Sequence, residues 1–278
     1  MTEPLLLATT RLSTFLGGAP LTAATAFFFA RGGRLFAVTS RHVLHDEASG
    51  HAPDRIELVL HLDATDLTRT AVQSILLYRQ GRAIWRQATD SAGPVDVAVI
   101  EIDRAALPPG VLLHAFGPHH LKPPAAGVEA GASLRVVGYP LGFFDTLHKL
   151  AVVRHAIVAS SFGVRFQGKG FFLTDGRLHR GSSGAPVVIR CDEDDGGAAE
   201  GDTALPWRLL GVHGGRLDMA DRDRVEDETL GLNCAWYADI LLALTAAAPD
   251  EAPAAAAAAP ASTPAPTPTR PVAPGRAA

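Results

Sequence analysis

Gly181-Ser182-Ser183-Gly184-Ala185-Pro186 is the stretch of sequence that decides the fold. Its residues are small except for the closing proline, so the backbone can turn tightly enough for the Gly181 and Ser183 amides to point at one spot. An apolar run follows at residues 185–190, and its length and composition predict a strand rather than a helix. A serine presented on such a turn is a candidate nucleophile, and the rest of the chain has to supply its partners.

Apolar runs rich in Val, Ile, Leu and Phe recur on both sides of this turn, separated by Gly, Pro and Asp clusters. This pattern is typical of an all-β domain. Gly32-Gly33 separates two such runs and predicts a hairpin, because paired glycines supply the positive φ angles that tight turns require. The predicted strands are residues 26–30, 34–39, 55–62, 71–78, 97–102, 134–138, 151–159, 170–174, 185–190, 207–212 and 229–234. So many strands favour two barrels.

The C-terminal part of the chain changes character twice. Residues 236–246 predict a helix, because Ile240, Leu241 and Leu244 are spaced to share one face. From residue 247 onward the chain consists mainly of Ala, Pro and Thr, which offer no bulky side chains to pack and too many prolines for a helix. We therefore expect one domain at residues 1–246 and a disordered tail at residues 247–278.

Two further residues complete the set that acyl transfer by a serine requires, namely an imidazole and a carboxylate. His42 follows the predicted strand at residues 34–39, and Asp96 stands at the head of the apolar run at residues 97–102. The chain order His, Asp, Ser is that of the double-barrel hydrolases, whereas α/β-hydrolases begin with a serine in a Gly-x-Ser-x-Gly turn before a helix. The sequence therefore favours His42, Asp96 and Ser183 as catalytic residues, with the Gly181 and Ser183 amides as oxyanion hole.

The segments around these residues resemble the HtrA-like branch of the trypsin-like serine peptidases. Thr39-Ser40-Arg41-His42-Val43 resembles the family's Thr-x-x-His-Val segment, and Asp96-Val97-Ala98-Val99 resembles Asp-Leu-Ala-Val. Residues 174–186 resemble the Thr-Asp run leading to Gly-Asn-Ser-Gly-Gly-Pro, and residues 138–142 are similar to the Gly-x-Pro-x-Gly turn. The resemblance covers roughly residues 22–244. It implies two six-stranded antiparallel β-barrels with the site in the cleft between them.

The resemblance also places the substrate-lining strand at Leu210-Gly211-Val212-His213. We expect Leu178, His213, Gly214 and Gly215 to shape the specificity pocket and to favour a small or medium apolar side chain before the scissile bond. An alternative for His213, a simple polar strand terminus, stays open.

Two departures from the family pattern bear on regulation. Ser182 stands where extracellular relatives carry the acid that pairs with a freshly cut N-terminus, so activation by propeptide cleavage is not expected. Only the Ala/Pro tail follows the predicted domain, so regulation through a PDZ domain is not expected either. Any activating partner is left unidentified.

Rival sites are weaker. Ser182 suits a spacer in the oxyanion turn, and Asp90 lies in a predicted loop rather than at the head of a strand. The histidines outside the set lack the spacing of metal ligands, and the acidic stretches at residues 192–195 and 218–228 lack the calcium-loop pattern. Cys191 and Cys234 are expected to be free thiols, since neither lies in a glycine-rich turn or beside a paired histidine. No metal or cofactor is expected.

Composition limits the partners and the compartment. A net charge of −4 over 278 residues gives no basic surface of the kind that nucleic acid or an anionic membrane requires. The N-terminus does not read as a signal peptide, no apolar stretch reaches the ~20 residues of a spanning helix, and two cysteines suit a reducing compartment. We expect a cytoplasmic protein.

The sequence thus predicts a serine endopeptidase acting on protein or peptide substrates. A catalytically latent or idle pseudopeptidase that binds peptides in the same cleft is the alternative, and an esterase stays open because the same triad hydrolyses esters.

Overall fold

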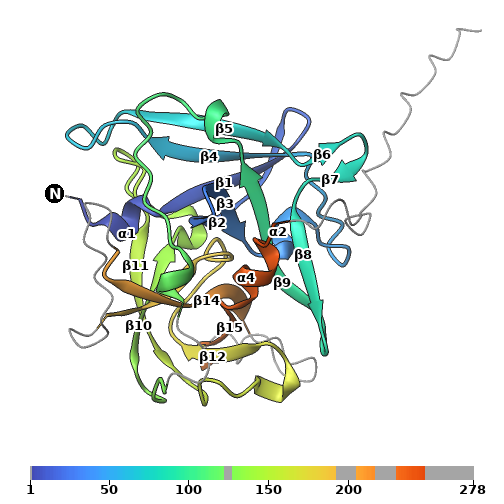
Figure 1. Cartoon of the computed structure of the whole chain (residues 1–278), viewed down its shortest axis with the longest axis vertical. Coiled ribbons are helices and arrows are strands. Elements are labelled where there is room, and N and C mark those ends of the chain that lie inside the picture. Colours follow the sequence, from blue (N-terminus) through green and yellow to red (C-terminus); the bar gives the residue numbers. More distant parts are fainter. Residues whose placement is uncertain (1, 122–126, 192–204, 217–229, 248–278) are drawn as a thin grey trace, which may run out of the picture.

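The computed structural model describes residues 2–121, 127–191, 205–216 and 230–247, and its strands form two main units (Figure 1). N-terminal strands build a seven-stranded sheet, and C-terminal strands build a closed barrel. The sheet runs, in spatial order, β5 (Thr70–Leu76), β4 (Arg55–His61), β1 (Thr9–Leu16), β2 (Ala19–Arg31), β3 (Arg34–Thr39), β9 (Gly93–Ile102) and β8 (Arg86–Asp90). The barrel runs β10 (Ser133–Gly138), β11 (Val152–Val158), β12 (Phe171–Asp175), β15 (Leu232–Tyr237), β14 (Trp207–Arg216) and β13 (Pro186–Arg190).

Short elements connect these strands. The pair β6 (Tyr78–Arg79) and β7 (Arg82–Ala83) forms a small hairpin of its own. Among the described residues the helices are α1 (Pro4–Leu7), α2 (Arg41–Leu44) and α4 (Ile240–Leu244), with 3-10 turns η1 (Arg104–Ala106), η2 (Pro118–His120), η3 (Pro140–Gly142) and η4 (Phe166–Gly168). No helix among the described residues is long and apolar enough to cross a membrane.

The hairpin of β2 and β3 forms where the paired glycines predicted it. Gly32 and Gly33 have φ angles of +56° and +78°, and Arg31 pairs with Arg34 across the turn. Residues on β2 alternate between two apolar clusters, because successive side chains of a strand point to opposite faces. Phe27 and Phe29 pack in a cluster shared with the barrel, whereas Phe28 packs in a cluster confined to the N-terminal half. The shared cluster joins the two units.

The predicted all-β architecture is confirmed in its coarser form. The six-stranded barrel of the C-terminal half is closed, and every strand pair in the two main units is antiparallel. The N-terminal strands form one sheet of seven, with β5 and β8 at its ends, so a second six-stranded barrel is not confirmed.

The C-terminal prediction was partly wrong about boundaries. Trp236 and Tyr237 belong to β15, because they pair with β14, and the helix begins only at Ile240. The tail beyond residue 247 lies outside the described residues, as do the acidic stretches at residues 192–195 and 218–228.

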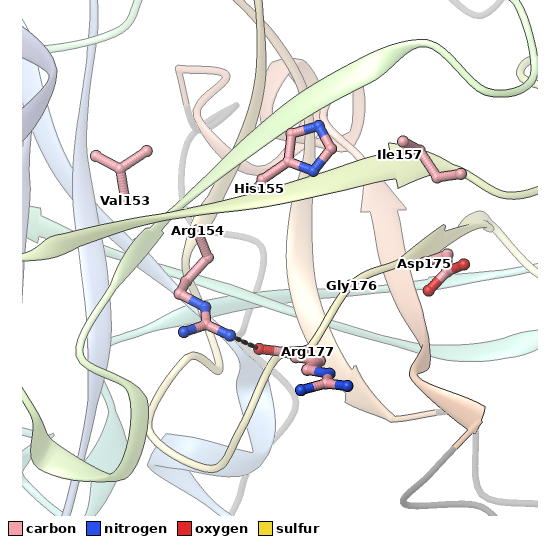
Figure 2. Close-up of a pocket in the computed structure, with 7 residues that line it drawn as sticks. All are labelled: Val153, Arg154, His155, Ile157, Asp175, Gly176 and Arg177. Atoms are coloured by element: carbon pink, nitrogen blue, oxygen red, sulfur yellow. Dashed lines mark hydrogen bonds between the residues drawn. The ribbon is translucent and has the colours of Figure 1, made fainter.

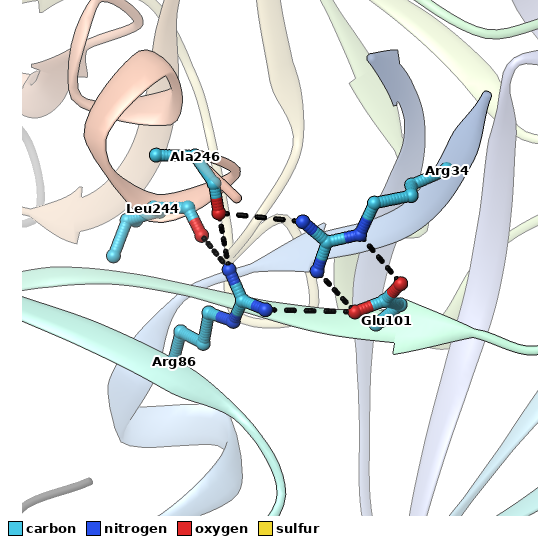
Figure 3. A network of polar contacts seen from close by, with 5 residues as sticks. All are labelled: Arg34, Arg86, Glu101, Leu244 and Ala246. Carbon is cyan, nitrogen blue, oxygen red and sulfur yellow. Dashed lines mark hydrogen bonds and ion pairs between the residues drawn. The ribbon is translucent and has the colours of Figure 1, made fainter. Parts of the chain in front are cut away.

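A polar network fastens the end of α4 to the N-terminal sheet (Figure 3). Nη1 of Arg86 donates to the Ala246 carbonyl at 2.7 Å and to the Leu244 carbonyl at 3.5 Å, and Nη1 of Arg34 donates to Ala246 at 3.3 Å. Glu101 on β9 bridges both arginines, with its Oε1 2.6 Å from Arg34 Nε and its Oε2 3.6 Å from Arg86 Nη2. Guanidinium groups thus satisfy the carbonyls that a helix C-terminus leaves without partners.

Candidate active site

The N-terminal sheet positions two of the three predicted catalytic side chains. His42 lies in α2, the short helix that begins two residues after β3 ends at Thr39. Asp96 lies on β9, which pairs with β3 so that Thr39 faces Ala98. The sequence predicted Asp96 at the head of this strand. Because β9 begins at Gly93, Asp96 instead lies inside the strand. Pairing of β3 with β9 therefore brings the imidazole and the carboxylate together.

Hydrogen bonds join His42 to both of its predicted partners. Its Nδ1 lies 2.7 Å from Asp96 Oδ2, and its Nε2 lies 3.0 Å from Ser183 Oγ. The His42 amide donates to the other Asp96 oxygen at 2.9 Å, so the carboxylate is held at two points. With Nδ1–H donating to the carboxylate, Nε2 carries a lone pair toward the serine hydroxyl. The three side chains thus form one continuous chain.

The pKa of His42 reflects opposing influences. Burial of the ring disfavours its protonated form, but the hydrogen bond that the ring donates to Asp96 and the negative charge of Asp96 outweigh burial and raise the pKa above its ordinary value of 6.5. A protonated His42 is thereby stabilised, as is needed of a group that takes a proton from a hydroxyl and later returns it.

The turn carrying Ser183 requires glycine at two positions. Gly181 and Gly184 have φ angles of +91° and +82°, in the left-handed region that side chains disfavour. A Cβ on Gly181 would lie 2.4 Å from the Tyr139 carbonyl oxygen, and a Cβ on Gly184 would lie 2.3 Å from the Thr25 carbonyl oxygen. Glycine is needed at both positions for conformation and for space.

Neither of the two predicted oxyanion donors has a partner within the described part of the chain. The Gly181 and Ser183 amides make no hydrogen bond there, whereas the neighbouring Ser182 amide donates to the His179 carbonyl at 3.1 Å and the Gly184 amide to the His213 carbonyl at 2.8 Å. The Gly181 and Ser183 amides are therefore available to an acceptor placed beside Ser183.

His213 lies in the interior of β14. Only 2% of it is exposed, and its Nδ1 has no hydrogen-bond partner among the described residues. Burial, together with the charge of nearby His42, lowers the pKa of His213 to about 4. Its carbonyl accepts hydrogen bonds from the Ser40 hydroxyl and the Gly184 amide, and these bonds tie the segment before His42 to the Ser183 turn. The side chain is a neutral, buried imidazole.

The other predicted pocket residues differ in their surroundings. Leu178 is 4% exposed and packs in the apolar core of the barrel. At Gly214 a Cβ would lie 2.9 Å from Trp236 Nε1, so the Trp236 ring requires glycine there, and the same Cβ would lie 3.4 Å from Asp96 Oδ2. Gly215 has a φ of +154° and no neighbour within 4 Å of an added Cβ. Of the two glycines, only Gly215 borders open space, whereas Gly214 is packed against Trp236 and Leu178 lies in the core.

A hollow of about 540 Å³ lies near the start of the same turn segment (Figure 2). Two guanidinium groups line it, and Arg154 Nη2 donates to the Arg177 carbonyl at 2.8 Å. Its remaining lining residues are Val153, His155, Ile157, Asp175 and Gly176. None of the four predicted pocket residues lines this hollow, although Leu178 follows Arg177 directly.

The residues considered as alternatives to the predicted catalytic residues have other surroundings. Asp90 ends β8 and forms an ion pair with Arg165 at 2.6 Å. Both cysteines are free of disulfides, and burial raises the pKa of the Cys234 thiol to about 12, which opposes formation of a nucleophilic thiolate. Ser182 is 2% exposed and points away from solvent. Across the described ranges, no group of three or more His, Cys, Asp or Glu side chains is placed to hold a metal ion.

One residue that contacts the site was missed by the sequence reasoning. Thr25 on β2 donates its hydroxyl to the Gly181 carbonyl at 2.7 Å and its amide to the Ser183 carbonyl at 3.0 Å. Thr25 and Gly181 are 156 residues apart, and Thr25 stands in the run Ala23-Ala24-Thr25-Ala26, which carries no motif. Only the packing of the sheet against the barrel reveals the contact.

Comparison with known proteins identifies the family of this chain. Residues 24–194, more than half of the chain, match the family described as the trypsin-like peptidase domain. The chain belongs to the trypsin-like peptidase family. This membership confirms the family and the class of enzyme predicted from the sequence. A search among curated proteins finds no match.

Several solved structures of proteases are similar to this member of the family. The HtrA-type protease AlgW with a tripeptide matches with 17% identity and a TM-score of 0.49, over 87% of this chain and 60% of that protein. A serine endoprotease from Yersinia pestis matches with 14% identity and a TM-score of 0.48, over 87% and 65%. The active form of the Rv3671c protease from M. tuberculosis matches with 15% identity and a TM-score of 0.47, over 90% and 87%. The chain thus spans less than two thirds of the length of the first two proteins.

Proposed function

We propose that this chain is a serine endopeptidase in which Ser183 attacks the scissile carbonyl. His42 takes the hydroxyl proton as general base and returns it to the leaving amine as general acid, while Asp96 holds the ring in the tautomer that keeps Nε2 free. The observation that carries the proposal is the position of the His42 ring, which bonds Asp96 through one nitrogen and Ser183 through the other at 2.7 and 3.0 Å.

The tetrahedral intermediate needs donors for its negative oxygen. We assign this role to the Gly181 and Ser183 amides. Two features support the assignment: neither amide is used within the described residues, and both belong to the same short turn, which leads into β13. The catalytic unit is proposed to be residues 1–246, with the tail at 247–278 outside it.

The substrate is proposed to be a protein or peptide with a small or medium apolar side chain before the scissile bond. Leu178, His213, Gly214 and Gly215 are the residues assigned to the pocket, and none of them offers a negative charge to a basic side chain. Profiling with a peptide library tests this: cleavage confined to positions after Arg or Lys would contradict the assignment.

A fluorophosphonate probe tests the reaction itself, because it captures a serine only when base and oxyanion donors are in place. We expect the wild-type protein to be labelled, and peptide mapping to place the label on Ser183 and not on the adjacent Ser182. Ser183→Ala should abolish labelling and lower turnover by ~10⁴- to 10⁶-fold, with the melting temperature nearly unchanged.

Two outcomes would overturn the proposal. Turnover persisting in Ser183→Ala would exclude this nucleophile. A folded wild-type protein that no probe labels, with or without cell extract, would indicate a peptide-binding protein without catalysis.

A further inference from the structure

Thr25 is a buried threonine at the contact between the two units, and its side chain is fully used. Its hydroxyl donates to the Gly181 carbonyl at 2.7 Å and accepts from the Tyr139 amide at 3.1 Å. Its amide donates to the Ser183 carbonyl at 3.0 Å, and its own carbonyl accepts from the Thr39 hydroxyl at 2.8 Å. No part of its side chain is exposed.

These contacts belong to a pattern along the turn. All four carbonyls from residue 180 to residue 183 accept a hydrogen bond. The Leu141 amide holds the Arg180 carbonyl at 2.5 Å, and the Ala185 amide holds the Ser182 carbonyl at 2.9 Å. Thr25 holds the remaining two, those of Gly181 and Ser183. One residue of the N-terminal sheet therefore fixes every second peptide unit of the turn.

Fixing a carbonyl fixes the amide on the other side of the same peptide plane, because the two point in opposite directions. The Arg180 and Ser182 carbonyls set the directions of the Gly181 and Ser183 amides in this way. The units between them must also be held, since Gly181 has the backbone freedom of a glycine and a φ of +91°. The Thr25 hydroxyl holds the carbonyl side of the unit that follows Gly181, and the His179 carbonyl, which accepts from the Ser182 amide, holds its other side.

We propose that Thr25 is a positioning residue for the oxyanion turn: its hydroxyl and amide hold the Gly181 and Ser183 carbonyls so that both donor amides face one acceptor. This inference rests on the proposed function. Through β2 and β3, Thr25 also connects the turn with the sheet that carries His42 and Asp96. It therefore fixes the position of the oxyanion donors relative to His42.

The space for the hydroxyl is provided by a glycine on the facing strand. A Cβ on Gly138 of β10 would lie only 2.6 Å from Thr25 Oγ1. Glycine at this position therefore lets β10 come close enough for the threonine side chain to reach the turn and the Tyr139 amide together.

Substitutions of Thr25 separate its hydroxyl from its shape. Thr25→Val keeps the volume and removes the hydroxyl, and Thr25→Ser keeps the hydroxyl. Thr10→Val is the matched control, because the buried Thr10 hydroxyl also donates to a backbone carbonyl, that of Val59 at 2.7 Å, and accepts from the Val59 amide at 3.1 Å, but it lies between β1 and β4.

We expect Thr25→Val to lower kcat on a peptide substrate by about 10²-fold with KM nearly unchanged, because the turn acts on the intermediate and not on the bound substrate. Fluorophosphonate labelling of Ser183 should slow by a similar factor. Thr25→Ser should restore most of both rates. Thr10→Val should lower the melting temperature as Thr25→Val does while leaving kcat near the wild-type value. A purely structural role for Thr25 predicts the same kcat in the two valine variants, and that result would overturn the proposal.

Hydrogen exchange of the peptide covering residues 178–186 supplies a readout that does not depend on activity. We expect faster exchange in Thr25→Val than in the wild-type protein or in Thr10→Val. If the wild-type protein is neither labelled nor active, the proposed function fails, and this exchange experiment alone decides the positioning role. Unchanged exchange in Thr25→Val would then refute it.

Discussion

Replacing His213 by glutamine should remove a specific part of the acid sensitivity of the fold. In the folded protein, burial and the charge of His42 hold the pKa of His213 at about 4, against an ordinary value of 6.5. Unfolding exposes the ring and returns its pKa to that ordinary value. Between these values the unfolded chain binds more protons than the folded chain, so stability is complete above pH 6.5 and is lost as the pH falls toward about 4.

The size of the effect follows from the difference between the two pKa values. Each unit corresponds to about 1.4 kcal/mol, so the full loss is about 3 kcal/mol, and about 2.5 kcal/mol of it falls between about pH 7.5 and pH 4.5. Because His213 is only 2% exposed, solvent screening does not reduce this figure appreciably. This is a substantial share of the stability of an ordinary domain.

Urea denaturation at a series of pH values measures this contribution. The free-energy difference between wild-type protein and His213→Gln should shrink by about 2.5 kcal/mol from about pH 7.5 to pH 4.5, since glutamine does not titrate. His155→Gln, on an exposed position of β11, is the control and should keep the wild-type pH dependence. Equal pH dependence in wild-type protein and His213→Gln would refute the reasoning.

Three further outcomes are expected. Asp96→Asn should lower kcat by about 10⁴-fold. It should also move the acidic limb of the pH–rate profile to lower pH, because the hydrogen bond to Asp96 and the charge of Asp96 raise the pKa of His42. A measured profile whose acidic limb does not move would count against this. Gly184→Ala should destabilise the fold by about 3 kcal/mol in urea and abolish labelling, whereas Gly17→Ala, at a φ of +57° in open space, should cost about 1 kcal/mol. Glu101→Gln should lower stability by less than about 1 kcal/mol, because the carboxylate is 43% exposed, and the loss should shrink with added salt in a thermal melt.

Local signals in the sequence predicted what depends on local chemistry. The paired glycines located the β2–β3 hairpin, and the spacing of apolar runs located most strands to within a few residues. The residues flanking His42, Asp96 and Ser183 were recognisable one by one. The fold brings His42 within hydrogen-bond distance of both Asp96 and Ser183.

Features that depend on packing were not predictable in this way. The apolar spacing predicted a helix from Trp236 onward, but pairing with β14 places Trp236 and Tyr237 in a strand. No local signal indicated that Leu178, which we assign to the specificity pocket, packs in the core of the barrel. Thr25 has no motif, because its partners lie on a turn far along the chain and only the docking of sheet on barrel brings them within reach.

The arginine network at the end of α4 bears on the order in which the molecule matures during synthesis. Arg34 and Arg86 bind carbonyls of residues 244 and 246, which leave the ribosome after every catalytic candidate has already emerged. Until then, the sheet bearing His42 and Asp96 lacks the hydrogen bonds from Arg34 and Arg86 to these carbonyls. The apolar cluster shared with the barrel also lacks Leu241 and Leu244. The arrangement of the sheet against the barrel is therefore complete only once residue 246 has been synthesised and has reached its two arginine partners.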